Sequence, residues 1–175
     1  MLNESRHLER LVNDLLELSR LQDAGFQLCK EEINLCNVVS DAVRAIRPAA
    51  QAKHIVIEAT VPKMECLLSG DYGRIRQLLF ILLDNAVKFS PEGGAIQINL
   101  AKTEGCTLSV TDHGVGIPQE DLPHIFDRFY KTNSKENKNG TGLGLAIASE
   151  IVKRHNARIS AQNGEDGTSF QVVFP

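Results

Sequence analysis

The sequence predicts an α+β fold: a two-layer α/β sandwich of a mixed, mostly antiparallel sheet and helices, preceded by one N-terminal bundle helix. Three observations predict it. Two pairs of short alternating segments, each joined by a glycine-containing turn, are typical of β-hairpins. A long amphipathic helix pattern precedes the first pair, and a shorter one lies between the pairs. The two hairpins disfavour the main alternative, a doubly wound parallel sheet.

The composition is that of a globular chain able to bury a core, since 42% of its 175 residues are hydrophobic and 23% are charged. The net charge of −3 includes no basic stripe, so we expect no nucleic-acid partner. The four cysteines lack disulfide or zinc spacing, which favours a cytoplasmic location. No segment approaches the roughly 18 apolar residues of a membrane span, and we expect a soluble chain.

Residues 1–23 predict a helix with a narrow leucine seam, typical of a bundle or coiled coil. The seam is Leu8, Leu11, Leu15 and Leu18. Because it lasts only about two heptads, the helix cannot be stable alone and must pack on its own domain or on another chain. We therefore expect two parts, residues 1–23 and a main domain of residues 27–175.

The main domain begins with a predicted strand, Gln27 to Leu35, and a helix, Asn37 to Ala52, that is expected to be irregular near Pro48. A second strand is expected over His54 to Thr60. Asp71 then caps the predicted central helix, which runs to Phe89. Its apolar face is Ile75, Leu78, Leu79, Leu82, Leu83 and Ala86.

Two hairpins, a polar loop and one helix complete the predicted order. The loop, Lys131 to Gly140, lacks apolar anchors, as is typical of a mobile lid. The helix is expected over Thr141 to His155. The hairpin strands are expected over 95–102, 106–111, 157–161 and 168–174.

Asn85 and Lys88 fall on one flank of the central helix, next to its apolar face. An amide oxygen is a hard ligand for Mg²⁺, and a lysine one turn later supplies charge to phosphate. Taken alone, such a pair is more commonly a solvated amide and a surface charge.

Two glycine-rich motifs add complementary chemistry. In Asp112–Pro118 a carboxylate leaves a strand just before two glycines, so it can accept a hydrogen bond from the exocyclic amine of adenine. Gly140–Leu145 runs into a helix, whose free N–H groups suit phosphates. Each motif has a purely structural alternative, a tight turn or a glycine loop, and neither is a dinucleotide-binding or Walker-type fingerprint.

Aromatic residues flank two basic residues just before the lid. Phe126, Phe129 and Tyr130 surround Arg128 and Lys131. Such aromatics are commonly core packing, but as a hinge they would carry the basic residues onto a nucleotide when the lid closes.

These motifs, in this order, resemble those of the catalytic, ATP-binding domain of bacterial sensor histidine kinases, in the superfamily that includes gyrase, Hsp90 and MutL. The likeness covers about Gln27 to Pro175 and implies the Bergerat ATP-binding fold, with ATP and Mg²⁺ as cofactors and Asn85 as the metal ligand. The ATP-binding residues that it implies are Asn85, Lys88, Phe89, Asp112, Gly114, Gly116, Ile117, Phe126, Arg128, Phe129, Lys131, Gly140, Thr141, Gly142, Leu143, Gly144, Leu145 and Thr168.

The leucine-seam helix resembles the second helix of that family's dimerisation and phosphoacceptor hairpin. The first helix, which carries the acceptor histidine in the family, is absent, and His7 lacks the acid and proline of the acceptor pattern. The resemblance thus implies a fragment of a sensor. Its partners would be a response regulator receiver domain and a phosphoacceptor helix of its full-length chain or dimer mate, with a possible homodimer through the N-terminal helix. It also implies a cytoplasmic domain of a membrane-anchored sensor.

One departure from the family bears on the reaction. Hydrolytic members of the superfamily place a glutamate one turn before the metal-binding asparagine, and this chain has Ile81. Without that base, water attack should be slow, whereas a histidine nucleophile needs mainly positioning and charge neutralisation. We therefore expect transfer of the γ-phosphoryl group of ATP to a histidine. The alternatives are a non-catalytic ATP-gated interaction module and an ATPase of the gyrase or Hsp90 kind.

Overall fold

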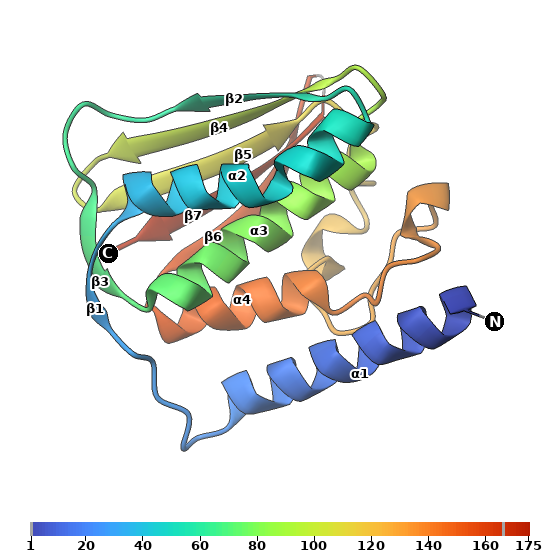
Figure 1. Ribbon diagram of the computed structural model, residues 1–175, viewed down its shortest axis with the longest axis horizontal. Coiled ribbons are helices and arrows are strands. Elements are labelled where there is room, and N and C mark those ends of the chain that lie inside the picture. The colour runs from blue at the N-terminus through green and yellow to red at the C-terminus, as the bar shows by residue number, and fades with distance from the viewer. Residues whose placement is uncertain (1, 166) are drawn as a thin grey trace.

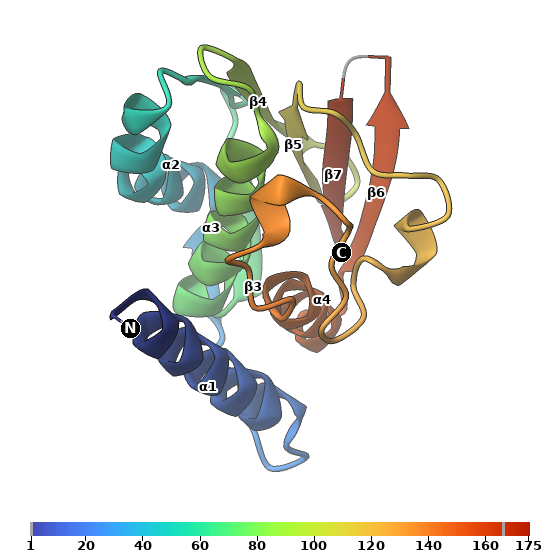
Figure 2. The same cartoon turned by 90° about the vertical axis from the view of Figure 1, so that its right-hand side faces the viewer.

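The protein is a two-layer α/β sandwich in which a five-stranded sheet is covered on one face by three helices (Figure 1). The computed structural model describes residues 2–165 and 167–175. Figure 2 shows the three helices on one side of the sheet and the N-terminal helix outside them. The predicted α+β class is confirmed. Within the described residues, no helix is long and apolar enough to cross a membrane.

The main sheet has the strand order β2-β4-β5-β7-β6. Its pairings are antiparallel except for the parallel pair β2 and β4, so both predicted hairpins are present. The alternate side chains of the central strand β5 are buried under the helices, and the last of them is Asp112. The strands are β2 Val56–Thr60, β4 Ala95–Lys102, β5 Cys106–Asp112, β6 Arg158–Gly164 and β7 Gly167–Phe174.

The covering helices are α2 Leu35–Ala52, α3 Tyr72–Phe89 and α4 Gly144–Arg154. As predicted, Asp71 caps α3, since its carboxylate accepts a hydrogen bond of 3.1 Å from the N–H of Arg74. All six residues predicted for the apolar face of α3 are buried against the sheet and its neighbours.

Four sequence expectations differ from the structure. The first strand, β1 Glu31–Asn34, is shorter than predicted, and it pairs with an unpredicted strand, β3 Leu67–Gly70, in a separate two-stranded sheet. Helix α2 continues through Pro48 without a break, because the proline ring lies on its exposed side, one turn before its end. Helix α4 begins at Gly144, later than expected, because Gly142 has a left-handed φ of 73°.

The N-terminal helix, α1 Leu2–Gln22, packs along α4, and its fully buried residues lie in its C-terminal half. Leu18 and Leu21 are 1% and 0% exposed, whereas Leu8 and Leu16 are 61% and 55% exposed. Glu17 forms an ion pair with Arg74 of α3. The predicted helix is therefore present, and it leaves an apolar face uncovered within the described structure. Two short 3₁₀ turns, Leu122–His124 and Lys135–Asn137, complete the elements.

Candidate functional site

A cavity of about 990 Å³ lies between α3, α4, the loop after β5, the lid and α1. Most of the residues predicted to bind nucleotide converge on it from four separate segments of the chain. Those that line the cavity are Asn85, Lys88, Phe89, Asp112, Gly116, Ile117, Lys131, Gly140, Thr141, Gly142, Gly144, Leu145 and Thr168. This volume is in the range of small-molecule and cofactor sites.

Three of the predicted residues support the cavity from behind without lining it. A Cβ at Gly114 would lie 2.4 Å from the carbonyl oxygen of Phe89, so glycine lets this loop cross the end of α3. Phe126 packs edge-to-face on Phe170, with ring centroids 6.4 Å apart, and Phe170 lines the cavity. Leu143 is fully buried in the core.

The two remaining predicted residues, Arg128 and Phe129, lie at the hinge of the lid. Arg128 is exposed and donates a hydrogen bond to Gln22 of α1, so its guanidinium does not line the cavity. Phe129 has a positive φ of 60°, and its N–H donates a 2.8 Å hydrogen bond to the carbonyl oxygen of Gly142. This bond joins the two residues that flank the lid, and so brings its two ends together.

Asp112 lies in the inner wall of the cavity, where it is 5% exposed. Its carboxylate accepts a 2.9 Å hydrogen bond from the N–H of Gly114. Burial raises the pKa of Asp112, while hydrogen bonds from the backbone of Gly114 and Thr168 oppose the shift. Such a buried carboxylate can accept a hydrogen bond from a flat ring bearing an amine.

Asn163 holds the loop that carries Ile117, a role that sequence reasoning missed. Its Nδ2 donates to the carbonyl oxygen of Ile117 at 2.5 Å, and its Oδ1 accepts from the N–H of Ile117 at 2.9 Å. Gly116 beside it has a φ of 78°, which favours glycine. The sequence carries no signal for this contact, because the partners are 46 residues apart.

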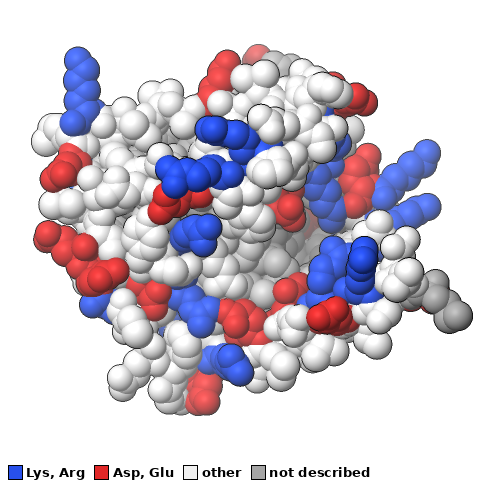
Figure 3. Space-filling view, viewed as in Figure 1, with Lys and Arg blue, Asp and Glu red and all other residues white. Residues whose placement is uncertain are grey.

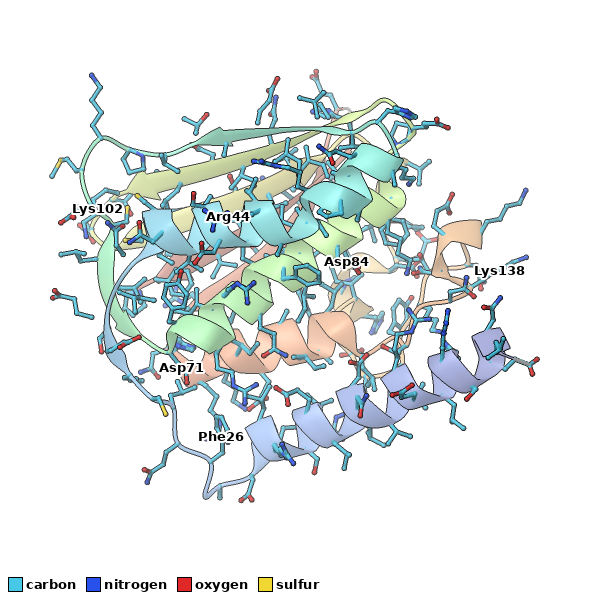
Figure 4. The ribbon with its side chains drawn as sticks, in the orientation of Figure 1. Phe26, Arg44, Asp71, Asp84, Lys102 and Lys138 are labelled. Atoms are coloured by element: carbon cyan, nitrogen blue, oxygen red, sulfur yellow. The ribbon has the colours of Figure 1, made fainter. Side chains whose placement is uncertain are left out.

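Lys88 and Asn85 face the cavity from the last turns of α3, as the helical spacing predicts. The Lys88 ammonium donates a 2.8 Å hydrogen bond to the Oδ1 of Asn137 in the lid. Burial lowers the pKa of Lys88, the charges of Lys131 and Arg10 act in the same direction, and Asp84 opposes them. Asp84 also lines the cavity, and Figure 4 labels it on α3, between α3 and the lid.

Asn137 is the polar centre of the lid. Its Oδ1 accepts the hydrogen bond from Lys88, and its Nδ2 donates to the hydroxyl of Thr132 at 2.6 Å. Gly140 brings the chain close to the same ammonium, since a Cβ there would lie 2.8 Å from the Nζ of Lys88. The lid thus supplies an amide oxygen to a cation that phosphate would also attract.

The helix α1 also contributes to the cavity wall, which the sequence did not indicate. Arg10 and Asp14, one turn apart, line the cavity, and the Asp14 carboxylate accepts a 2.6 Å hydrogen bond from the hydroxyl of Thr141. The other lining residues that were not predicted as ligands are Gln77, Phe80, Ile81, Asp84, Val115, Pro118, Glu120, Asp121, Ile125, Tyr130, Thr132, Asn133, Ser134, Asn137, Asn139, Ile147 and Phe170.

The donor set suits a magnesium ion only when the ion shares oxygens with a ligand. Among the described residues, no group of three or more His, Cys, Asp or Glu side chains is arranged to hold a metal. Asn85 offers one hard oxygen donor to the cavity. Magnesium commonly combines one or two protein oxygens with phosphate oxygens and water, so the residues present fit that mode.

The fold and this cavity place the chain in a class of ATP-binding proteins. A family described as "Histidine kinase-, DNA gyrase B-, and HSP90-like ATPase" matches residues 70–175, and the chain belongs to this family. Within it, the chain contains a catalytic ATP-binding domain of the sensor histidine kinase type.

Relatives and solved structures of this type align with nearly the whole chain. Sensor histidine kinase WalK of Bacillus subtilis is 34% identical over 179 residues, covering 99% of this chain and 29% of WalK. Full-length ShkA in complex with AMPPNP has a TM-score of 0.81 at 29% identity, covering 97% of this chain and 36% of that chain. ThkA in complex with the response regulator TrrA has a TM-score of 0.82 at 27% identity, covering 99% and 48%. The chain spans 29% of WalK and 42% of sensor kinase WalK of Staphylococcus aureus, less than half of either protein.

Proposed function

We propose that this chain binds ATP with Mg²⁺ and supplies the γ-phosphoryl group to a histidine on a helical hairpin, for relay to an aspartate of a response regulator. One observation carries the proposal. Asn85, Asp112 and the Gly140–Leu145 loop, which are far apart in the sequence, line a single cavity of nucleotide size. The response regulator bound by the similar protein ThkA supports the proposed partner.

Each proposed role follows from the chemistry of a side chain in the cavity. Asp112 would accept a hydrogen bond from the adenine amine, and Thr168 lies beside it on the paired strand. Lys88 and Lys131 would contact the phosphates, with Arg128 brought in by movement of the lid. Asn85 would hold Mg²⁺, which when bound neutralises phosphate charge.

The proposed transfer of the γ-phosphoryl group is an in-line displacement. A neutral imidazole nitrogen of the acceptor forms a bond to the γ-phosphorus while the bond from that phosphorus to the bridging oxygen breaks, and ADP leaves. The resulting phosphoimidazolium then loses the N–H proton of its other ring nitrogen to solvent. The proposed acceptor is a histidine that this chain does not itself supply. The uncovered face of α1, which includes Leu8 and Leu16, would pack on the other helix of the hairpin or on a second copy.

Ile81 favours transfer over hydrolysis. It lines the cavity one turn before Asn85, and an alkyl side chain cannot take a proton from water. The carboxylate of Asp84 also lines the cavity, which keeps an ATPase as the second candidate. A non-catalytic ATP-gated module is the third, since the packing of α1 beside the lid would let a nucleotide alter a docking surface.

The test measures nucleotide binding and phosphoryl transfer separately. Titration of a fluorescent ATP analogue should show binding that Asp112→Asn weakens about fivefold or more, since a buried acceptor is lost. Phosphoryl transfer to a supplied histidine hairpin should require Asn85 and leave an acid-labile product. Binding without transfer would favour the gated module, and steady phosphate release without an acceptor would favour the ATPase. No nucleotide binding at all would overturn the proposal.

We also infer, from the likeness to sensor kinases, that the domain works in the cytoplasm as part of a membrane-anchored sensor. Fusion of a reporter enzyme to this domain within its full-length protein tests the inference. The reporter should be active on the cytoplasmic side of the membrane, and activity on the outer side would contradict the inference.

A further inference from the structure

Arg10 lies outside the residues that the family matches, yet it lines the nucleotide cavity. Helix α1 brings it to the wall beside the lid, together with Asp14 one turn later. Asp14 is tied to the glycine loop through its 2.6 Å hydrogen bond with the hydroxyl of Thr141. The N-terminal helix therefore closes one side of the cavity, next to the loop proposed to hold the phosphates.

The docking of the same helix brings the backbone of Arg10 to the cavity. Leu18 and Leu21 are fully buried, and Glu17 pairs with Arg74 of α3. Because Arg10 precedes Leu18 by about two turns of one continuous helix, its side chain is carried to the rim of the cavity. Figure 1 shows α1 running below α4 towards the lid.

The Arg10 guanidinium has N–H donors that are not used in hydrogen bonds within the described residues. Within the described residues it makes one long hydrogen bond, 3.5 Å from its Nη2 to the carbonyl oxygen of Asn139. A guanidinium has five N–H donors, arranged to match a phosphate in a bidentate way. Most of these donors therefore remain free for an anion in the cavity.

The charged residues of the cavity wall indicate why an additional cation would favour phosphate binding. Three cations and five carboxylates belong to its lining residues, so the wall carries few positive charges that could offset the negative charges of a triphosphate. Figure 3 shows basic side chains around the hollow at the right of that view, with acidic ones between them. The cations are Arg10, Lys88 and Lys131, and the carboxylates are Asp14, Asp84, Asp112, Glu120 and Asp121.

We propose that Arg10 contacts the phosphates of the bound nucleotide, so that α1 supplies part of the site and triphosphate binding favours the docked position of α1. This inference rests on the proposed ATP binding and adds to that site a basic residue supplied by α1. The linkage is reciprocal, since a ligand that binds better to the docked state shifts the helix towards that state.

The test compares nucleotides that differ in phosphate number. We expect Arg10→Ala to weaken Mg-ATP binding about fivefold to twentyfold, as for loss of a charge-assisted contact at an exposed site, and to leave adenosine binding within about twofold. Arg10→Lys should lose less, because it keeps the charge. Arg6→Ala is the matched control, one turn earlier on the exposed part of α1 and outside the cavity lining.

Hydrogen exchange gives a second readout that a purely structural role would not produce. ATP should slow exchange of the α1 amides in the native chain, adenosine should not, and Arg10→Ala should abolish the ATP effect. Unchanged ATP binding in Arg10→Ala, or an equal loss for ATP and adenosine, would overturn the inference while the proposed function stands. If the native chain bound no ATP, the proposed function and this inference would both be refuted.

Discussion

Lys53 is predicted to stabilise the end of helix α3, which carries Asn85 and Lys88. Its ammonium donates to three backbone carbonyl oxygens, those of Val87 at 2.9 Å, Lys88 at 2.9 Å and Ser90 at 2.7 Å. These oxygens lie at the helix C-terminus, where intrahelical donors run out and the helix dipole attracts a cation. Lys53→Met removes the charge while keeping most of the apolar stem.

The magnitude follows from these three bonds. One charged hydrogen bond contributes about 1.5–3 kcal/mol, but a single, partly exposed ammonium shares its charge among three acceptors, so the total is near one strong bond plus the dipole effect. We expect Lys53→Met to lower the free energy of unfolding by about 2–3 kcal/mol, and Tm by about 5–10 °C for a domain of this size. Urea and thermal unfolding, followed by circular dichroism, measure both quantities.

The control is Lys63→Met, which removes an exposed lysine that forms no hydrogen bond within the described residues and should change the free energy of unfolding by less than about 0.5 kcal/mol. Lys53→Arg should recover part of the loss. If Lys53→Met unfolds at the same urea concentration as the native chain, the three carbonyl contacts are not stabilising and the reasoning is refuted.

Three further predictions concern the loop, pH and metal. Gly142→Ala should lower the free energy of unfolding by at least about 1 kcal/mol, because φ is 73° and the new Cβ would lie 2.9 Å from the backbone of Phe129. The control Gly73→Ala lies inside helix α3 and should be neutral or stabilising. Equal unfolding midpoints for the two variants would contradict this prediction. Burial lowers the pKa of His155, whose Nε2 accepts the N–H of Asp71, so its neutral form is favoured by folding. That contribution is complete above the unfolded pKa of about 6.5 and is lost as pH falls through the lower folded pKa, so urea stability should drop towards pH 5, less so in His155→Gln. Chelation of Mg²⁺ with EDTA should weaken ATP binding about tenfold or more while adenosine binding is unchanged, and equal ATP affinity with and without the metal would argue against a metal-bridged phosphate.

Local patterns predicted the elements that depend on local chemistry. The Asp71 cap and the apolar face of α3 are set by spacing within one helix, and both are present. The hairpins likewise follow from turns and alternation. In contrast, the strand β3 was missed, because four residues carry little periodic signal and the strand is stabilised by pairing with β1, more than 30 residues earlier.

In the candidate site, too, features set by local sequence were predicted and those set by long-range packing were not. Motif spacing led to Asn85, Asp112 and the glycine loop, which meet in the cavity. The Asn163 contacts with Ile117, and the placement of Arg10 in the wall, arise only when distant segments pack together, so no pattern along the chain marks them.

The most direct measurement is a crystal structure of this chain with AMPPNP and Mg²⁺. We expect the adenine amine within hydrogen-bonding distance of the Asp112 carboxylate, the metal on the side-chain oxygen of Asn85, and the phosphates along the glycine loop near Gly142. Nucleotide bound elsewhere on the surface, with these three positions empty, would contradict it.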